Sequence, residues 1–197
     1  LIVADQELLT PAEAARGWLI AHGYEASLLV HPELEPEFSG MPHAAKKAVV
    51  VADAGDSFSY AGLNQAFRHL IDGAPLLALA KNRTFKDDDG ELSLDVGAFV
   101  NALEFASGEH AVVLGKPSAE FFNAALASMS CAPEAAVMVG DDAEADVAGA
   151  LAAGLGSALL VRTGKYRAGD EARFEPRPTQ TVADIGQAAD WICAHAA

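Results

Sequence analysis

Apolar and polar positions along the chain form short blocks that predict strands separated by amphipathic helices. Continuous apolar runs indicate buried strands, and apolar residues that recur at helical spacing indicate helices. The predicted strands are 26–30, 48–52, 75–80, 112–114, 136–139 and 158–161. The predicted helices are 10–22, 59–71, 95–107, 119–129, 143–154 and 182–194. This alternation predicts an α/β fold built on parallel strands.

Two of the predicted strands end abruptly in charged residues. One runs into GKPS, which contains Lys116, and the other runs into GDD, which contains Asp141 and Asp142. Asp146 follows four residues after Asp142, a spacing that places two side chains on one face of a helix. Ligands bind at the carboxyl ends of parallel strands. We therefore expect Lys116 and the three aspartates at the rim of one sheet, on adjacent strand ends.

These residue types suit phosphoryl transfer. Crowded carboxylates repel one another unless a cation lies among them, and Mg²⁺ typically takes one or two protein carboxylates together with phosphate oxygens. Lys116 adds a point charge suited to a phosphoryl oxygen. The spacing alone also fits an exposed loop lysine and a solvated acidic helix start, because aspartate is favoured at helix N-termini.

The order of these motifs resembles a known family. GKPS followed by a helix and then GDDxxxD is similar to the third and fourth motifs of the haloacid dehalogenase-like (HAD) phosphohydrolases. Five stretches in chain order resemble the family members that act on phospholysine, phosphohistidine and inorganic pyrophosphate: VVVADAGDSFSYAGLNQAFRHLI, LSLDVGAFVNALEFASG, VLGKPSAEFFNAAL, AVMVGDDAEADVAGA and VRTGKYRAGDE. The resemblance implies a large α/β (C2-type) cap domain over residues 1–93. It also implies that residues 94–197 form the C-terminal portion of a Rossmann-like HAD core.

The resemblance further implies a Mg²⁺-dependent phosphatase that works through an aspartyl-phosphate. In that scheme Asp141 binds Mg²⁺ directly, while Asp142 and Asp146 hold metal-bound waters and orient Lys116. Lys116 is then both catalytic and substrate-binding, because it neutralises the transferring phosphoryl group. The implied substrate is a small phosphorylated molecule or phosphoamino acid, with P–N bonds or pyrophosphate as candidates. Pyridoxal-phosphate and nucleotide-monophosphate phosphatases share most of these motifs and stay as alternatives.

One part of the family pattern is not in this sequence. The family's nucleophile is the first Asp of a DxDGT-like motif, and a Ser or Thr motif follows it. The stretch LIVADQELLT resembles the first motif at Asp5, but it has no glycine for the turn. Thr10, Pro11 and Glu13 instead form an N-cap, a first helical proline and a capping box. Since the chain also begins with Leu1, we expect that the sequence starts inside a longer protein that supplies the nucleophile upstream.

Two non-phosphatase interpretations are open at this point. A catalytically incomplete fragment or a non-catalytic binding module would account for the absent nucleophile motif. A phospho-receiver domain also places an acid pair, an aspartate and a lysine on a parallel sheet. There the lysine follows the acids, whereas Lys116 precedes them here, so chain order argues against a receiver.

Charge and composition indicate which classes of binding partner and which cellular compartment are expected. The 28 acidic and 13 basic residues give a net charge of −15, which argues against nucleic acid or an anionic membrane as a partner. No apolar run reaches membrane-spanning length. Cys131 and Cys193 lack metal-ligand spacing, so a reducing, cytoplasmic setting is expected. Analogy with the family makes a cap-mediated homodimer possible.

Two further groups of basic residues follow predicted strands. Lys81, Arg83 and Lys86 could contact a phosphorylated substrate from a cap loop, but we favour a solvated basic edge beside the acidic turn predicted at 87–90. Arg162 and Lys165, with Thr163 between them, could lie near the phosphate, but we favour loop structure or a subunit contact for them.

Overall fold

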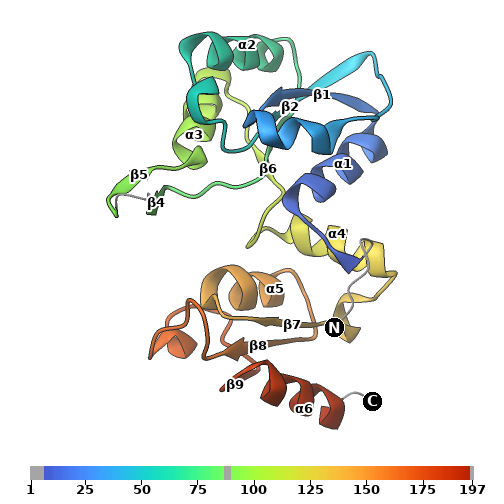
Figure 1. The fold of residues 1–197 in the computed structure, drawn as a ribbon. Helices are drawn as coiled ribbons and strands as arrows, with labels where there is room; N and C mark the ends of the chain where they lie inside the picture. Colours follow the sequence, from blue (N-terminus) through green and yellow to red (C-terminus); the bar gives the residue numbers. More distant parts are fainter. Residues whose placement is uncertain (1–6, 87–89, 196–197) are drawn as a thin grey trace. The chain divides into compact units, whose positions relative to one another are not determined.

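The computed structural model describes residues 7–86 and 90–195 and divides the chain into two compact units (Figure 1). The first unit is Leu1–Gly115 and the second is Lys116–Ala197. Each unit has a parallel sheet together with helices, so the predicted α/β class is confirmed. The assignment of residues 1–93 to a cap and 94–197 to a core stays a prediction. Within the described residues, no helix has the length and apolar character needed to span a bilayer.

The first unit is organised around a four-stranded parallel sheet in the order β1-β2-β3-β6. Its strands are β1 (Tyr24–Leu29), β2 (Lys46–Val51), β3 (Leu76–Ala78) and β6 (Val112–Val113). Val49, Val50 and Val51 of β2 are fully buried, which means that both faces of this central strand are covered. A continuous valine run is the pattern expected of such a strand.

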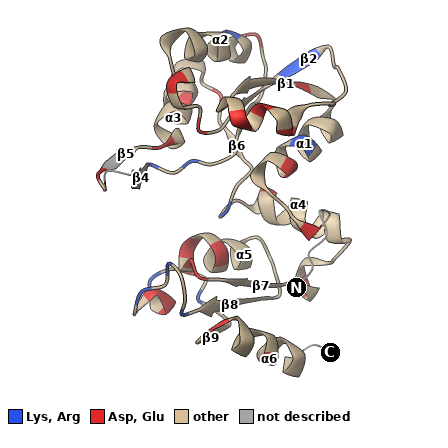
Figure 2. Cartoon of the chain, in the orientation of Figure 1, with Lys and Arg blue, Asp and Glu red and all other residues tan. Residues whose placement is uncertain are grey.

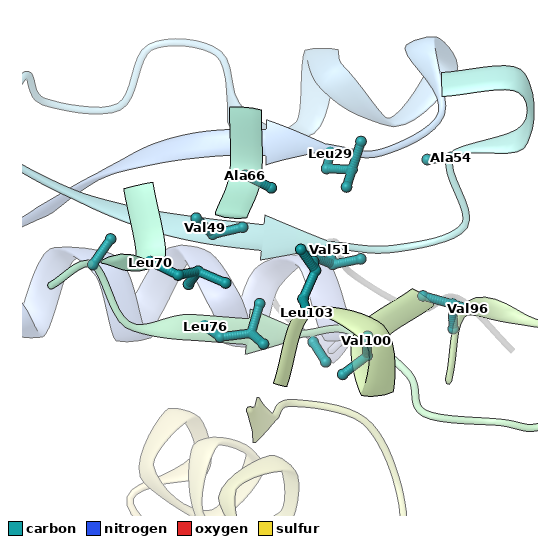
Figure 3. Close-up of a cluster of buried hydrophobic side chains, with 12 residues drawn as sticks. Leu29, Val49, Val51, Ala54, Ala66, Leu70, Leu76, Val96, Val100 and Leu103 are labelled. Carbon is teal, nitrogen blue, oxygen red and sulfur yellow. The ribbon is translucent and has the colours of Figure 1, made fainter. Parts of the chain in front are cut away.

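The helices of the first unit begin and end where the sequence predicts. They are α1 (Pro11–His22), α2 (Tyr60–Ile71) and α3 (Val96–Ser107), with short 3-10 turns at Pro32–Phe38 and Gly55–Ser57. The Thr10 hydroxyl accepts a hydrogen bond from the Glu13 N–H, and Gly23 ends α1 in the left-handed conformation. Side chains of α2 and α3 pack on one face of the sheet, where Leu70, Val100 and Leu103 contact the core around Val49 and Leu76 (Figure 3).

A two-stranded antiparallel sheet interrupts the path from β3 to α3. It pairs β4 (Thr84–Lys86) with β5 (Leu92–Leu94). This pairing has the form of the hairpin that the acidic turn at 87–90 predicts, although residues 87–89 themselves lie outside the described part of the chain. The bulky side chains Phe85 and Leu94 on these strands are exposed.

Glu104 of α3 ties three segments of the first unit together. Its carboxylate lies 2.7 and 2.8 Å from the Lys81 ammonium and accepts a hydrogen bond of 2.9 Å from the Ala111 N–H. Lys81 is therefore held in an ion pair. Burial of Glu104 favours its neutral form, but the Lys81 and Ala111 hydrogen bonds outweigh burial and hold the pKa of Glu104 below its usual range.

Replacing Glu104 with glutamine is expected to lower the free energy of unfolding by about 1–2 kcal/mol, because a charge-assisted pair is lost. A depressed pKa stabilises the fold fully above the ordinary glutamate pKa of about 4.5, and this contribution disappears as pH falls through the folded-state pKa. The difference between wild type and E104Q in urea unfolding should therefore be largest near neutral pH and shrink in acid. E109Q, at an exposed glutamate nearby, is the control. An E104Q penalty that does not change with pH would contradict this account.

The second unit has its own three-stranded parallel sheet in the order β7-β8-β9. The strands are β7 (Val137–Gly140), β8 (Ser157–Val161) and β9 (Gln180–Val182), and the helices are α4 (Ala119–Met129), α5 (Gly149–Ala152) and α6 (Ile185–His195). Short 3-10 turns occupy Pro133–Ala135 and Asp170–Ala172. Ala158 and Leu160 of β8 pack in one cluster with Phe122 of α4, while Leu159 and Val161 pack in another with Ala188 of α6. Alternate side chains of β8 thus serve two separate cores.

The structure corrects the C-terminal prediction in two places. The helix predicted at 143–154 is a π-helical turn, Ala143–Ala148, followed by the short α5. The strand β9 was missed, and the last helix begins at Ile185 because Thr181 and Val182 pair with β8. A strand of three residues carries too little periodicity to be recognised from sequence.

The expectation that Lys116 and the aspartates follow adjacent strands of one sheet is wrong. The strand before Lys116 is β6, which pairs with β3 in the first unit through Leu77 and Val112. The strand before Asp141 is β7, which pairs with β8 in the second unit. Two apolar runs that look equivalent in sequence therefore join different sheets.

Candidate active site

The second unit brings Lys116 and the three aspartates together without help from a shared sheet. Asp141 and Asp142 follow β7 directly, and its last residue, Gly140, pairs with Leu160 of β8. Asp146 lies in the π-helical turn that comes next. Lys116 precedes α4, and its ammonium lies 2.6 Å from Asp146 Oδ1. The contact joins residues thirty positions apart in the chain.

Asp142 is the N-cap of the π-helical turn. Its Oδ1 accepts hydrogen bonds from the Glu144 and Ala145 N–H groups, at 3.1 and 2.9 Å. Its Oδ2 lies 3.4 Å from the Lys165 ammonium. Partial burial raises the pKa of Asp142, but the Ala145 N–H, the Lys165 charge and the Glu144 N–H together hold that pKa below its usual range. Asp142 is therefore ionised at neutral pH and anchored to backbone.

Asp146 is a buried carboxylate with a partner for each oxygen. Its side chain is 7% exposed. Lys116 donates to Oδ1, and the Asp142 N–H donates to Oδ2 at 3.2 Å. The Val147 N–H reaches the Asp142 carbonyl at 3.3 Å, a five-residue step that widens the turn. Asp146 thus contacts the backbone of Asp142.

Two glycines make this close packing possible. A Cβ at Gly140 would overlap the Asp146 carboxylate, so the carboxylate rests directly on the strand backbone. A Cβ at Gly149 would lie 2.6 Å from the Pro117 side chain, so the absence of a side chain lets the Lys116 segment approach the helical turn. The distance between Lys116 and Asp146 depends on both contacts.

Asp141 differs from the other two aspartates in its partners. Its Oδ2 accepts a 2.7 Å hydrogen bond from the Lys165 N–H. Neither lysine ammonium pairs with Asp141, because Lys116 pairs with Asp146 and Lys165 with Asp142. Among the described residues, none donates a hydrogen bond to Oδ1 of Asp141. Asp141 is a half-buried residue, and its Oδ1 is available to an additional ligand.

The described residues of the site could supply one carboxylate ligand to Mg²⁺. Across residues 7–86 and 90–195, no group of three or more His, Cys, Asp and Glu side chains is arranged to hold a metal ion. Mg²⁺, however, is usually bound by one or two carboxylates, with waters and substrate phosphates filling the other positions. The open oxygen of Asp141 meets that requirement as a single protein ligand.

Lys165 contacts both Asp141 and Asp142, whereas the sequence favours loop structure or a subunit contact at this position. The signal was present, because Lys165 follows the strand 158–161 and parallel strands end at the same edge. A shallow cleft of about 350 Å³ lies at this position. Its lining includes Asp141, Lys165, Arg167 and Arg173. Basic segments and an acidic turn lie together in the chain between β8 and β9 (Figure 2).

Known proteins of one family are similar to this chain in sequence. The HAD-hydrolase-like family model matches residues 113–188, which contain Lys116, the three aspartates and Lys165. The mouse haloacid dehalogenase-like hydrolase domain-containing protein 2 is 44% identical over 193 residues, covering 98% of this chain and 74% of that protein. The phospholysine phosphohistidine inorganic pyrophosphate phosphatase of Xenopus laevis is 41% identical over 194 residues, covering 98% of this chain and 71% of that protein.

Two solved structures are similar to this chain in fold. A p-nitrophenyl phosphatase from Archaeoglobus fulgidus aligns with a TM-score of 0.84 at 21% identity, over 97% of this chain and 77% of that one. A glycerol phosphate phosphatase from Mycobacterium tuberculosis, solved in complex with magnesium, aligns with a TM-score of 0.74 at 28% identity, over 90% of this chain and 56% of that one. The identity to the two curated relatives shows that the chain belongs to the haloacid dehalogenase-like family of hydrolases.

Proposed function

We propose that the protein is a Mg²⁺-dependent phosphatase that acts through an aspartyl-phosphate, with the nucleophilic aspartate upstream of Leu1. The observation that supports this proposal is that two of the three aspartates form ion pairs with lysines and the third does not. Asp146 and Asp142 each pair with a lysine, whereas Asp141 keeps one oxygen open. Mg²⁺-dependent phosphoryl transfer uses both a fixed cation for the phosphoryl group and a carboxylate free to bind Mg²⁺.

Lys116 serves the phosphoryl group. Its ammonium has three donors, and Asp146 accepts one of them. The side chain is 40% exposed, so the remaining donors can reach a phosphoryl oxygen and the nucleophilic carboxylate. The pairing with Asp146 also fixes the position of the ammonium before substrate arrives, which is how preorganised charge lowers a barrier.

Asp141 would hold Mg²⁺ through its open oxygen, and Asp142 would hold metal-bound waters. When bound, Mg²⁺ neutralises charge on the phosphoryl oxygens. The backbone hydrogen bonds of Asp142 keep its carboxylate anionic and stationary. Asp146 orients Lys116 from its buried position.

The proposed substrate is a small phosphorylated molecule or a phosphoamino acid. The 41% identity to a phospholysine phosphohistidine inorganic pyrophosphate phosphatase supports P–N bonds or pyrophosphate within that class. Pyridoxal-phosphate and nucleotide-monophosphate monoesters are the other candidates. A cytoplasmic setting and a cap-mediated homodimer stay predictions.

The test is phosphate release by the polypeptide that extends upstream of Leu1. We expect release from imidodiphosphate or pyrophosphate in the presence of Mg²⁺, with pyridoxal phosphate as the comparison substrate. Chelation with EDTA should lower the rate by about 10³-fold or more, and added Mg²⁺ should restore it. Release that persists without a divalent cation would contradict the mechanism. No release from any phosphorylated compound, with the fold intact, would favour the non-catalytic binding module.

A further inference from the structure

The turn after β8 is built against the carboxylate of Asp141. The Tyr166 N–H donates to the Thr163 carbonyl at 3.1 Å, which closes a four-residue turn with Gly164 and Lys165 at its centre. The Lys165 N–H points out of this turn and donates to Asp141 Oδ2 at 2.7 Å. The turn is fixed at its start by the Arg162 N–H, which donates to the Val182 carbonyl of β9 at 3.0 Å.

Gly164 is required at this position for two separate reasons. Its φ of +54° lies in the left-handed region that side-chain-bearing residues rarely adopt. A Cβ at Gly164 would also overlap Asp141 Oδ2, so the carboxylate rests against the glycine Cα. The backbone conformation and the free space are therefore both used to seat one carboxylate oxygen.

Gly169, five residues later, provides a control that distinguishes backbone strain from overlap with Asp141. Its φ of +97° carries the same conformational requirement, but a Cβ there would meet nothing within 4 Å. An alanine at Gly169 therefore strains the backbone without touching Asp141. An alanine at Gly164 does both.

We propose that Gly164 and the Lys165 N–H are positioning elements that hold Asp141 by Oδ2 and so present Oδ1 to the divalent cation. This inference rests on the proposed function, since it assigns a task to residues that serve the same metal. A hydrogen bond to one oxygen stops rotation of the carboxylate and directs the second oxygen, as outer-shell partners do in metal sites. The Lys165 side chain acts separately, because its ammonium faces Asp142.

The first measurement uses the metal-free full protein and follows the Lys165 amide by NMR. We expect its proton resonance to move upfield and its hydrogen exchange to quicken in D141A, because the acceptor is gone. G164A should produce a similar change, because the added Cβ displaces the acceptor. G169A should leave the Lys165 amide as in wild type. An amide that is unchanged in D141A would overturn the proposal even if G164A fails to fold.

The second measurement is the affinity for Mn²⁺, used as the probe cation and followed by electron paramagnetic resonance. G164A should weaken binding by about 10- to 100-fold, the usual effect of removing an outer-shell partner. G169A should bind as wild type does, and circular dichroism should show folded protein for both. Equal weakening in G164A and G169A would assign the effect to backbone strain and overturn the positioning role.

The two proposals fail in different ways. If D141A abolishes Mn²⁺ binding while G164A binds normally, the positioning role is overturned and the metal-dependent function stands. If the Lys165 amide responds to D141A and G164A but wild type binds no cation, the contact is supported and the proposed function is overturned.

Discussion

Replacing Lys116 with methionine is expected to lower kcat for phosphate release by about 10³-fold or more, with the larger part of the effect in kcat rather than KM. Stabilisation of the charge that develops in a phosphoryl transition state is worth roughly this factor when one cation supplies it. Methionine keeps most of the volume of the lysine stem but has no donor. Single-turnover measurement of phosphate release checks the prediction.

The same substitution is expected to destabilise the second unit, and the two effects must be separated. Asp146 is 7% exposed at its side chain, so removing Lys116 leaves a buried carboxylate without its charged partner. The expected loss in free energy of unfolding is about 1–3 kcal/mol. The double variant K116M/D146N removes the unpaired charge and should recover part of the stability with no recovery of activity.

An exposed ion pair in the same unit provides the control. Arg177 lies 2.9 Å from Glu175, and both side chains are exposed. R177M breaks this pair and should cost less than about 1 kcal/mol while kcat stays at the wild-type value. If K116M retained activity, or if K116M/D146N regained it, the catalytic assignment of Lys116 would be wrong.

Asp141→Asn is expected to abolish Mg²⁺ binding in the millimolar range and to lower activity by at least about 10³-fold. An amide keeps the size of the carboxylate and can still accept the Lys165 N–H, but it lacks the charge that binds a hard cation. Isothermal titration with Mg²⁺ and the phosphate-release assay together measure the change. Stability should change little, because Asp141 is half-buried and pairs with no ammonium.

Substitutions at two neighbouring acidic residues, Glu144 and Asp142, test whether the loss of Mg²⁺ binding is specific to Asp141. Glu144 is exposed and lines the same cleft, so E144Q removes an equal charge at nearly the same place and should bind Mg²⁺ as wild type does. D142N should fall between the two, because asparagine keeps the N-cap hydrogen bonds from Glu144 and Ala145. Equal losses in D141N and E144Q would show that the cation responds only to the general negative field.

Local signals in the sequence were sufficient for much of the fold. Thr10, Glu13 and Gly23 define the limits of α1 through interactions within a few residues, and the structure has the helix there. The fully buried valines of β2 likewise need no knowledge of distant segments to indicate a strand. Such elements are predictable because the physics that forms them is local.

Strand pairing between distant segments is the part of the fold that the sequence did not predict. Nothing within the run before Lys116 says that β6 pairs with β3 and not with β7. The three residues of β9 become a strand only because β8 offers an unpaired edge. Lys165 contacts Asp141 through a backbone N–H, a group that every residue except proline carries, so the residue type of Lys165 could not reveal this particular contact.

The burial of Asp146 changes how relatives of this protein should be compared. Within the described residues Asp146 is the one polar or charged residue that is buried, and it lies on Gly140 with Lys116 as its counter-ion. In a descendant that had lost catalysis, this ion pair would still stabilise the fold. Its presence in a homologue is therefore evidence of shared architecture and says little about turnover. Asp141 forms no buried ion pair with any described residue. It is therefore the position at which an inactive lineage would accumulate substitutions.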